Sequence, residues 1–142
     1  MDMIDRTFSI VVPKYDNSGS KIDVEIHKKY AKEMYEVFNG VSVIPVVLGC
    51  WHDKDINQVI CEENIMLFSS RDYDNPDIVN KEAQLKTDKA FIKQLARQVG
   101  TELGQRSVMT EEELVDIKFV KGNYQDKLPK QKLKVELFER YV

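Results

Sequence analysis

Seven side chains in two parts of the chain are of the kinds that hold a small anionic molecule. They are Trp51, Glu63, Asn64, Arg71, Gln105, Arg106 and Ser107. An indole ring offers a flat surface on which a base can stack, worth about 1–3 kcal/mol. Guanidinium groups form forked, charge-assisted hydrogen bonds with phosphate or carboxylate, and neutral amides and hydroxyls suit a purine or a ribose. We therefore predict a pocket for a small anionic, nucleotide-like ligand.

The same residue types also have structural explanations. Trp51 can be a half-buried aromatic residue of the core, and Arg71 and Arg106 can be solvated surface residues. The sequence leaves both explanations open.

Catalytic signatures are few in this sequence. It contains no G-x-x-x-x-G-K-[ST], G-x-G-x-x-G, H-E-x-x-H, C-x-x-C or G-x-S-x-G motif. His52 stands beside Asp53 and is a candidate general base, whereas Glu62 and Glu63 are neighbours on a predicted strand and point to opposite faces. We expect no catalytic residue, no metal and no cofactor. The alternative is a small dimeric α+β-barrel-type enzyme that uses His52 and Glu63.

Hydrophobic periodicity and capping signals predict six elements. Strands are expected over residues 6–13, 41–52, 58–70 and 114–120, and helices over residues 22–38 and 88–103. Thr87 and Asp88 are the predicted start of the second helix, and His27 is expected at the boundary of the core. Residues 71–85 are polar and predict an exposed loop, and residues 111–113 predict a bulge or tight turn.

This order, β-α-β-β-α-β, is the ferredoxin-like arrangement. It is an α+β fold in which two helices cover one face of a four-stranded antiparallel sheet. The other face also carries apolar residues, such as Ile44, Val46 and Leu48, and a sheet that is apolar on both faces needs a cover on both. Either a second subunit or the chain's own C-terminal segment would supply it. We predict a homo-oligomer, with a C2 dimer as the commonest solution.

Residues 123–142 are predicted to be a lysine-rich extension of a domain formed by residues 1–122. The net charge is −3, but residues 118–134 hold six lysines and one aspartate, and residues 1–117 carry −7. Alternating apolar residues from Leu133 onward make a free tail unfavourable and slightly favour a strand over a helix. We expect this extension to take part in assembly. The acidic body gives no continuous basic face for a nucleic-acid polymer.

Composition is that of one globular domain, with 142 residues, 42% hydrophobic and 32% charged. No apolar run reaches the roughly 20 residues that span a bilayer, and the N-terminus lacks the features of a signal peptide. We therefore expect a cytoplasmic protein without a membrane partner. Cys50 and Cys61 should lie opposite each other on neighbouring strands. Two buried thiols are the favoured interpretation, and a disulfide or a metal pair is the alternative.

Residues 38–120 resemble a family of small uncharacterised bacterial ferredoxin-like proteins. The similarity rests on GVSV, GCW and EENIML in the predicted hairpin and on LGQRSV after the second long helix. The family has G-x-T-V, G-x-W and Q-x-S-V at these places. The resemblance implies a ferredoxin-like fold in which Trp51, Glu63, Gln105 and Ser107 lie near one another.

The favoured hypothesis is a non-catalytic, oligomeric protein that captures an anionic, nucleotide-like ligand in pockets near subunit boundaries. In size and acidic character the chain is similar to phage-encoded anti-defence proteins that sequester the nucleotide signals of bacterial defence systems. The alternatives are the enzyme described above and a protein-binding inhibitor or structural phage protein.

Overall fold

The computed structural model describes residues 4–123 and 136–142. The elements in this part of the chain are β1 (Asp5–Pro13), α1 (Val24–Phe38), β2 (Ser42–Asp53), β3 (Gln58–Arg71), α2 (Lys81–Leu103), β4 (Thr110–Val115) and α3 (Glu136–Tyr141). The α+β class and the four-stranded antiparallel sheet are confirmed. Within the described residues, no helix combines the length and the apolar character that crossing a membrane requires.

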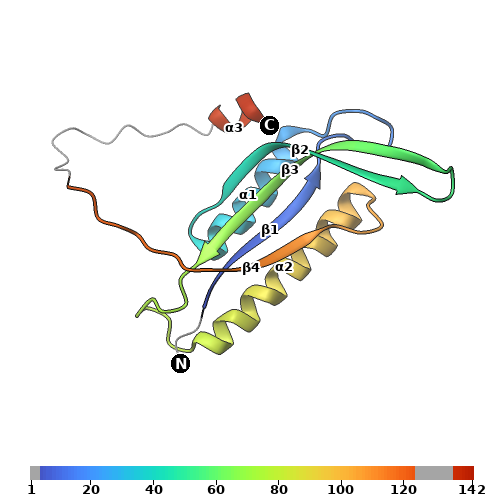
Figure 1. The fold of residues 1–142 in the computed structure, drawn as a ribbon. Coiled ribbons are helices and arrows are strands. Elements are labelled where there is room, and N and C mark those ends of the chain that lie inside the picture. Colours follow the sequence, from blue (N-terminus) through green and yellow to red (C-terminus); the bar gives the residue numbers. More distant parts are fainter. Residues whose placement is uncertain (1–3, 124–135) are drawn as a thin grey trace.

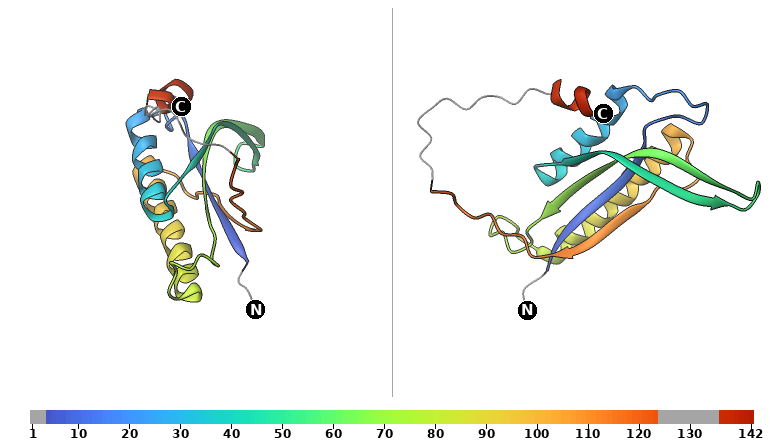
Figure 2. Two further views of the ribbon diagram at one scale, coloured as in Figure 1. Left: turned by 90° about the vertical axis from the view of Figure 1, so that its left-hand side faces the viewer. Right: turned by 45° about the horizontal axis from the view of Figure 1, so that its top comes forward.

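The four strands form one sheet in the order β2-β3-β1-β4, and α1 and α2 lie on the same face of it (Figures 1 and 2). The register pairs Ile10 with Leu67 and Val12 with Ile65, so the buried side chains of the two central strands point toward the helices. The helices contribute the rest of the main core, which includes Tyr30, Ala31, Met34, Phe38, Ile92, Leu95 and Val99.

α1 follows the predicted pattern closely. It begins after Asp23, whose carboxylate accepts a hydrogen bond from the Glu25 amide, and ends at Asn39 in the left-handed conformation. The expectation for His27 is wrong, because its side chain is fully buried. Its Nε2 lies 2.9 Å from the carbonyl oxygen of Pro13, which provides the partner that a buried ring needs.

α2 begins earlier than predicted, at residue 81 rather than 88. Its N-cap is Asn80, whose Oδ1 accepts a hydrogen bond from the Ala83 amide at 3.0 Å. The polar side chains of the first two turns hide the helical period, because only Leu85 among residues 81–87 packs against the core. Asp88 is a buried partner in an ion pair rather than a cap.

β4 is the second element whose bounds were wrong, since the strand lies at Thr110–Val115 rather than 114–120. The three glutamates at 111–113 lie inside the strand and do not form a turn. β4 is an edge strand, where charged residues are favoured because they discourage pairing with another sheet. Glu112 also has partners, with Arg6 at 3.9 Å and Lys89 at 3.6 Å.

The described end of the C-terminal segment is helical, so the slight preference for a strand is wrong for α3. This helix packs beside α1, where Glu139 forms an ion pair with Lys28. Phe138 packs against the core and Val142 is buried in it. Leu133 and the other residues from 124 to 135 fall outside the described residues.

Because α3 adds to the helical layer, no described element covers the opposite face of the sheet (Figure 2). Ile44 is 40% exposed, Val46 54% and Leu48 65%.

β2 and β3 continue beyond the helices as a long hairpin (Figure 1). A register shift between Ile44 and Val47 marks its start. Residues 49–62, which we call the hairpin arm, pair in the sheet only with each other, and none of them is buried. Cys50 and Cys61 pair as predicted, but they form a disulfide and are exposed. The preference for two buried thiols is therefore wrong, because the arm has no interior in which to bury them.

Candidate functional site

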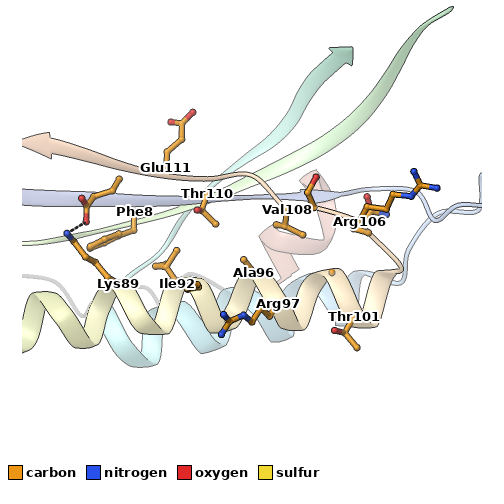
Figure 3. A pocket seen from close by; sticks show the side chains of 15 residues that line it. Phe8, Lys89, Ile92, Ala96, Arg97, Thr101, Arg106, Val108, Thr110 and Glu111 are labelled. Carbon is orange, nitrogen blue, oxygen red and sulfur yellow. Dashed lines mark ion pairs between the residues drawn. The ribbon is translucent and has the colours of Figure 1, made fainter. Parts of the chain in front are cut away.

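A cleft of about 880 Å³ lies between α2 and the segment that leads into β4 (Figure 3). It brings together three of the predicted ligand-binding residues, Gln105, Arg106 and Ser107. Its other lining residues are Phe8, Lys89, Ile92, Lys93, Ala96, Arg97, Gly100, Thr101, Val108, Thr110, Glu111 and Glu112. We call it the α2–β4 cleft.

Apolar residues on α2 form the floor of this cleft, and two of them, Ala96 and Gly100, are small. Ile92, Ala96 and Gly100 follow one another at helical spacing on the face that turns toward β4. Gly100 permits a close approach of the chain, because a Cβ atom there would lie 3.2 Å from the carbonyl oxygen of Gln105. The Gln105 amide in turn donates to the Gly100 carbonyl at 2.8 Å. The floor of the cleft is therefore apolar and its end wall is tied to the helix.

The turn after α2 positions the polar residues at that end. Gly104 ends the helix in the left-handed conformation, with φ of 63°, which glycine adopts without strain. Asn17 donates from Nδ2 to the Gly104 carbonyl at 3.1 Å. The side-chain amide of Gln105 donates to the carbonyl of Leu103 at 3.2 Å and to Oδ1 of Asn17 at 3.4 Å. These contacts leave the Gln105 side-chain oxygen as an acceptor for a ligand.

Four cationic and two acidic side chains line the cleft, a net charge of +2 on a chain whose net charge is −3. Lys89 pairs with Glu112 across one end (Figure 3). Lys93, Arg97 and Arg106 form no ion pair with any other described residue. A concentration of unpaired cations beside an apolar surface is a common arrangement for binding phosphate or carboxylate.

Arg71 lies elsewhere and already has partners. Its Nε and Nη2 donate to the two carboxylate oxygens of Asp88 at 2.6 and 3.1 Å, and Nη2 also donates to the Val37 carbonyl at 2.8 Å. The Tyr73 hydroxyl donates to the same carboxylate at 2.6 Å. Burial, followed by this hydrogen bond, raises the pKa of Tyr73 well above its usual value. Asp88 is fully buried, so Arg71 has a structural role in the single chain.

A second cleft of about 970 Å³ lies next to Arg71, between the end of β3 and the start of α2. Many of its polar side chains bond within the chain. Ser69 Oγ donates to the Gly40 carbonyl at 2.6 Å, Gln84 Nε2 donates to Asp88 at 2.9 Å, and Asn80 caps α2. These three groups hold the surrounding loop, so their bonded atoms are not free to contact a ligand.

The other predicted site residues belong to the hairpin. Trp51 is 44% exposed on the hairpin arm, and Glu63 and Asn64 lie at its base. The Asn64 amide donates to the carbonyls of Glu62 and Val47 at 3.2 and 3.4 Å. None of the three lines the α2–β4 cleft, so one chain by itself unites Gln105 with Ser107 but not with Trp51 or Glu63.

The proposed acid–base pair of His52 and Glu63 is not assembled within one chain. His52 pairs with Val59 in the sheet, four positions before Glu63 on β3, which is a separation of about 13 Å. The His52 ring bonds instead to Oδ1 of Asn57 at 3.0 Å, in the turn.

One acidic group has the spacing of a cation site. Carboxylate oxygens of Asp5, Asp72 and Asp74 lie within 4.8 Å of one another. Both Asp5 oxygens accept backbone hydrogen bonds, from the amides of Tyr73 and Ile117, each at 3.0 Å. Asp5 therefore joins the loop after β3 to the chain after β4.

Lys93, Arg97 and Thr101 were missed by sequence reasoning. Together with Lys89 they recur every four residues along α2, a spacing that places side chains along one side of a helix. This four-residue spacing can be seen in the sequence, but it is typical of any solvated helix surface and does not indicate a binding site.

No protein-family model matches the chain, and no curated protein sequence matches it. Solved structures with a similar fold were found. A phage SAM lyase in complex with S-methyl-5'-thioadenosine has a TM-score of 0.55 at 12% identity, over 80% of this chain and 86% of the lyase. The apo state of a phage SAM lyase gives 0.53 at 12% identity, over 85% and 92%. The divalent cation tolerance protein CutA1 from Thermus thermophilus gives 0.46 at 12% identity, over 84% and 88%. This likeness concerns the fold alone.

Proposed function

We propose that the protein binds a small anionic, nucleotide-like ligand in the α2–β4 cleft and does not convert it. The observation that carries this proposal is the set of three cations, Lys93, Arg97 and Arg106, which border an apolar floor and have no ion-pair partner among the described residues. Unpaired cations on an otherwise acidic chain attract anions and raise their local concentration.

Different surfaces of the cleft would contact different parts of the ligand. A base would lie on the apolar floor formed by Ala96, Gly100 and Val108, which removes apolar area from water. Ser107 and the free oxygen of Gln105 would bond to its polar edge or to the sugar. The arginines would hold phosphate through forked hydrogen bonds.

The proposal includes self-association of ferredoxin-like subunits. It is supported by the exposed apolar residues Ile44 and Val46 on the uncovered side of β2 and by the position of Trp51 and Glu63 outside the cleft of their own chain. A neighbouring subunit is the simplest cover for that face. The other part of the proposal is a role in sequestration, as in phage anti-defence proteins.

The fold comparison supports a second candidate, an enzyme. Two of the similar structures are phage SAM lyases, one of them bound to S-methyl-5'-thioadenosine. A nucleoside is the part that this compound has in common with the ligand proposed above, so the same cleft would bind it. The two candidates differ in whether the ligand leaves unchanged.

Calorimetry followed by chromatography separates them. Wild type and Arg106→Ala would be titrated with mono-, di- and cyclic nucleotides and with S-adenosylmethionine, and the bound material would then be released and separated. Loss of one charge-assisted contact should weaken binding about ten- to a hundredfold. The matched control is Lys86→Ala, since Lys86 is exposed on α2 but does not line the cleft. Intact ligand supports capture, a converted product supports the enzyme, and no binding by any compound contradicts both.

A further inference from the structure

We infer that the ligand of the α2–β4 cleft carries two separate anionic groups with an uncharged part between them. This inference rests on the proposed function and narrows it. The expected ligands are nucleosides with a phosphate at each of two separate positions, and short linear dinucleotides. Nucleotides that carry all their phosphates at one position do not belong to this class.

The cations of the cleft form two separate groups. Lys93 and Arg97 are one turn apart on α2, about 6 Å along its axis. Arg106 lies in the turn after the helix, three residues beyond its last residue, Leu103, and Arg97 is itself about 9 Å before that end. The side chains of Arg97 and Arg106 extend to different sides of the cleft rather than toward one point (Figure 3).

The remaining charges of the cleft do not join these two groups. Lys89 is neutralised by Glu112 at 3.6 Å, at the far end from Arg106. Glu111 adds negative charge on β4.

Between the two cationic groups the lining is neutral. Gly100 and Val108 are apolar, and Thr101 and Ser107 are hydroxyl residues without a side-chain hydrogen bond to another described residue. A nucleoside has this composition, with an apolar ring face and hydroxyl groups on its sugar. Coulomb attraction falls with distance in water, so a phosphate placed at one cationic group gains less from the other.

The test compares ADP with two other ligands that also carry two phosphate groups but place them apart, and adenosine and AMP serve as references with no phosphate and one phosphate. Wild type would be titrated by calorimetry with adenosine, AMP, ADP, adenosine 3',5'-bisphosphate and the 5'-phosphorylated dinucleotide pApA. We expect the bisphosphate and pApA to bind at least about tenfold more tightly than ADP. For these two compounds, Arg97→Ala and Arg106→Ala should each reduce affinity about tenfold or more, whereas AMP should respond strongly to only one of the substitutions. Lys86→Ala is the control for the loss of one positive charge on α2.

Two results would overturn the inference while leaving the proposed function intact. One is that ADP binds as tightly as the bisphosphate. The other is that both arginine variants weaken AMP equally, which would show that the two side chains converge on one phosphate. If none of these adenine compounds binds but a compound of the wider panel does, this inference fails and the proposed function stands. If no compound of either panel binds, both fail.

Discussion

Arg71 and Arg106 border two different clefts, and their surroundings are opposite. Arg71 makes three hydrogen bonds within the chain, two of them to the buried carboxylate of Asp88, and its guanidinium lies 5.0 Å from the ring centroid of Phe38. Arg106 is exposed and pairs with no described carboxylate. The volume of a cleft therefore does not by itself make it a binding site. What distinguishes these two clefts is whether the arginine that borders each one is already bonded within the protein.

The largest expected effect is on stability at the cleft beside Arg71. Arg71→Ala should lower the free energy of unfolding by about 3–5 kcal/mol, because it leaves the buried Asp88 without its cation. Arg106→Ala should change it by no more than about 0.5 kcal/mol. Urea unfolding followed by far-UV circular dichroism measures both, and it avoids reliance on Trp51, which reports on the hairpin arm. Equal losses for the two variants would show that Arg106 also has a structural role.

The comparison also shows what sequence reasoning can and cannot find. The strands from residue 5 to 71 were predictable because alternation and turn residues are local, and α1 because its apolar stripe is continuous. The starts of α2 and β4 were not, because Asn80 resembles a loop residue and the three glutamates of β4 resemble a turn. Gln105, Arg106 and Ser107, which were predicted from their charge and hydrogen-bonding groups, do line one cleft, and their role in binding stays a prediction. The sequence did not reveal that Arg71 has a structural role instead, because its partner Asp88 is distant in sequence and only the fold places the two together.

The hairpin arm differs from the region around Arg71 because none of its residues is buried. An isolated two-stranded hairpin is marginally stable in water, so the Cys50–Cys61 disulfide should supply much of the stability of the arm. In the double variant Cys50→Ser, Cys61→Ser, we expect the arm to lose about 2–3 kcal/mol of protection. Hydrogen exchange of residues 49–62, compared with that of β1, measures this.

Wild type treated with a dithiol reductant should behave like the double variant, with unchanged exchange in β1. If the arm keeps its full protection after either treatment, strand pairing alone holds it and the disulfide has no such role.

The smallest expected effect is on the pH dependence of stability. As with the two arginines, one histidine is bonded inside the protein and the other is exposed. His27 is fully buried, its Nε2 bonds to the Pro13 carbonyl, and Nδ1 has no partner among the described residues. Burial is the main cause of its lowered pKa, and Lys14 and Lys21 contribute further. His52 is exposed on the hairpin arm.

A histidine with a lowered pKa stays neutral in the folded chain while the unfolded chain takes up a proton near pH 6.5. The unfolded state then binds more protons, so the stability of the wild type should fall as the pH is lowered from 7.5 through 6.5 to about 5. Urea unfolding at each pH measures this slope. His27→Gln, whose amide can still donate to Pro13, should have a lower stability but a flatter slope, whereas His52→Gln should keep the slope of the wild type. A slope that survives in His27→Gln would mean that other groups cause it and that burial of His27 does not set the pH dependence.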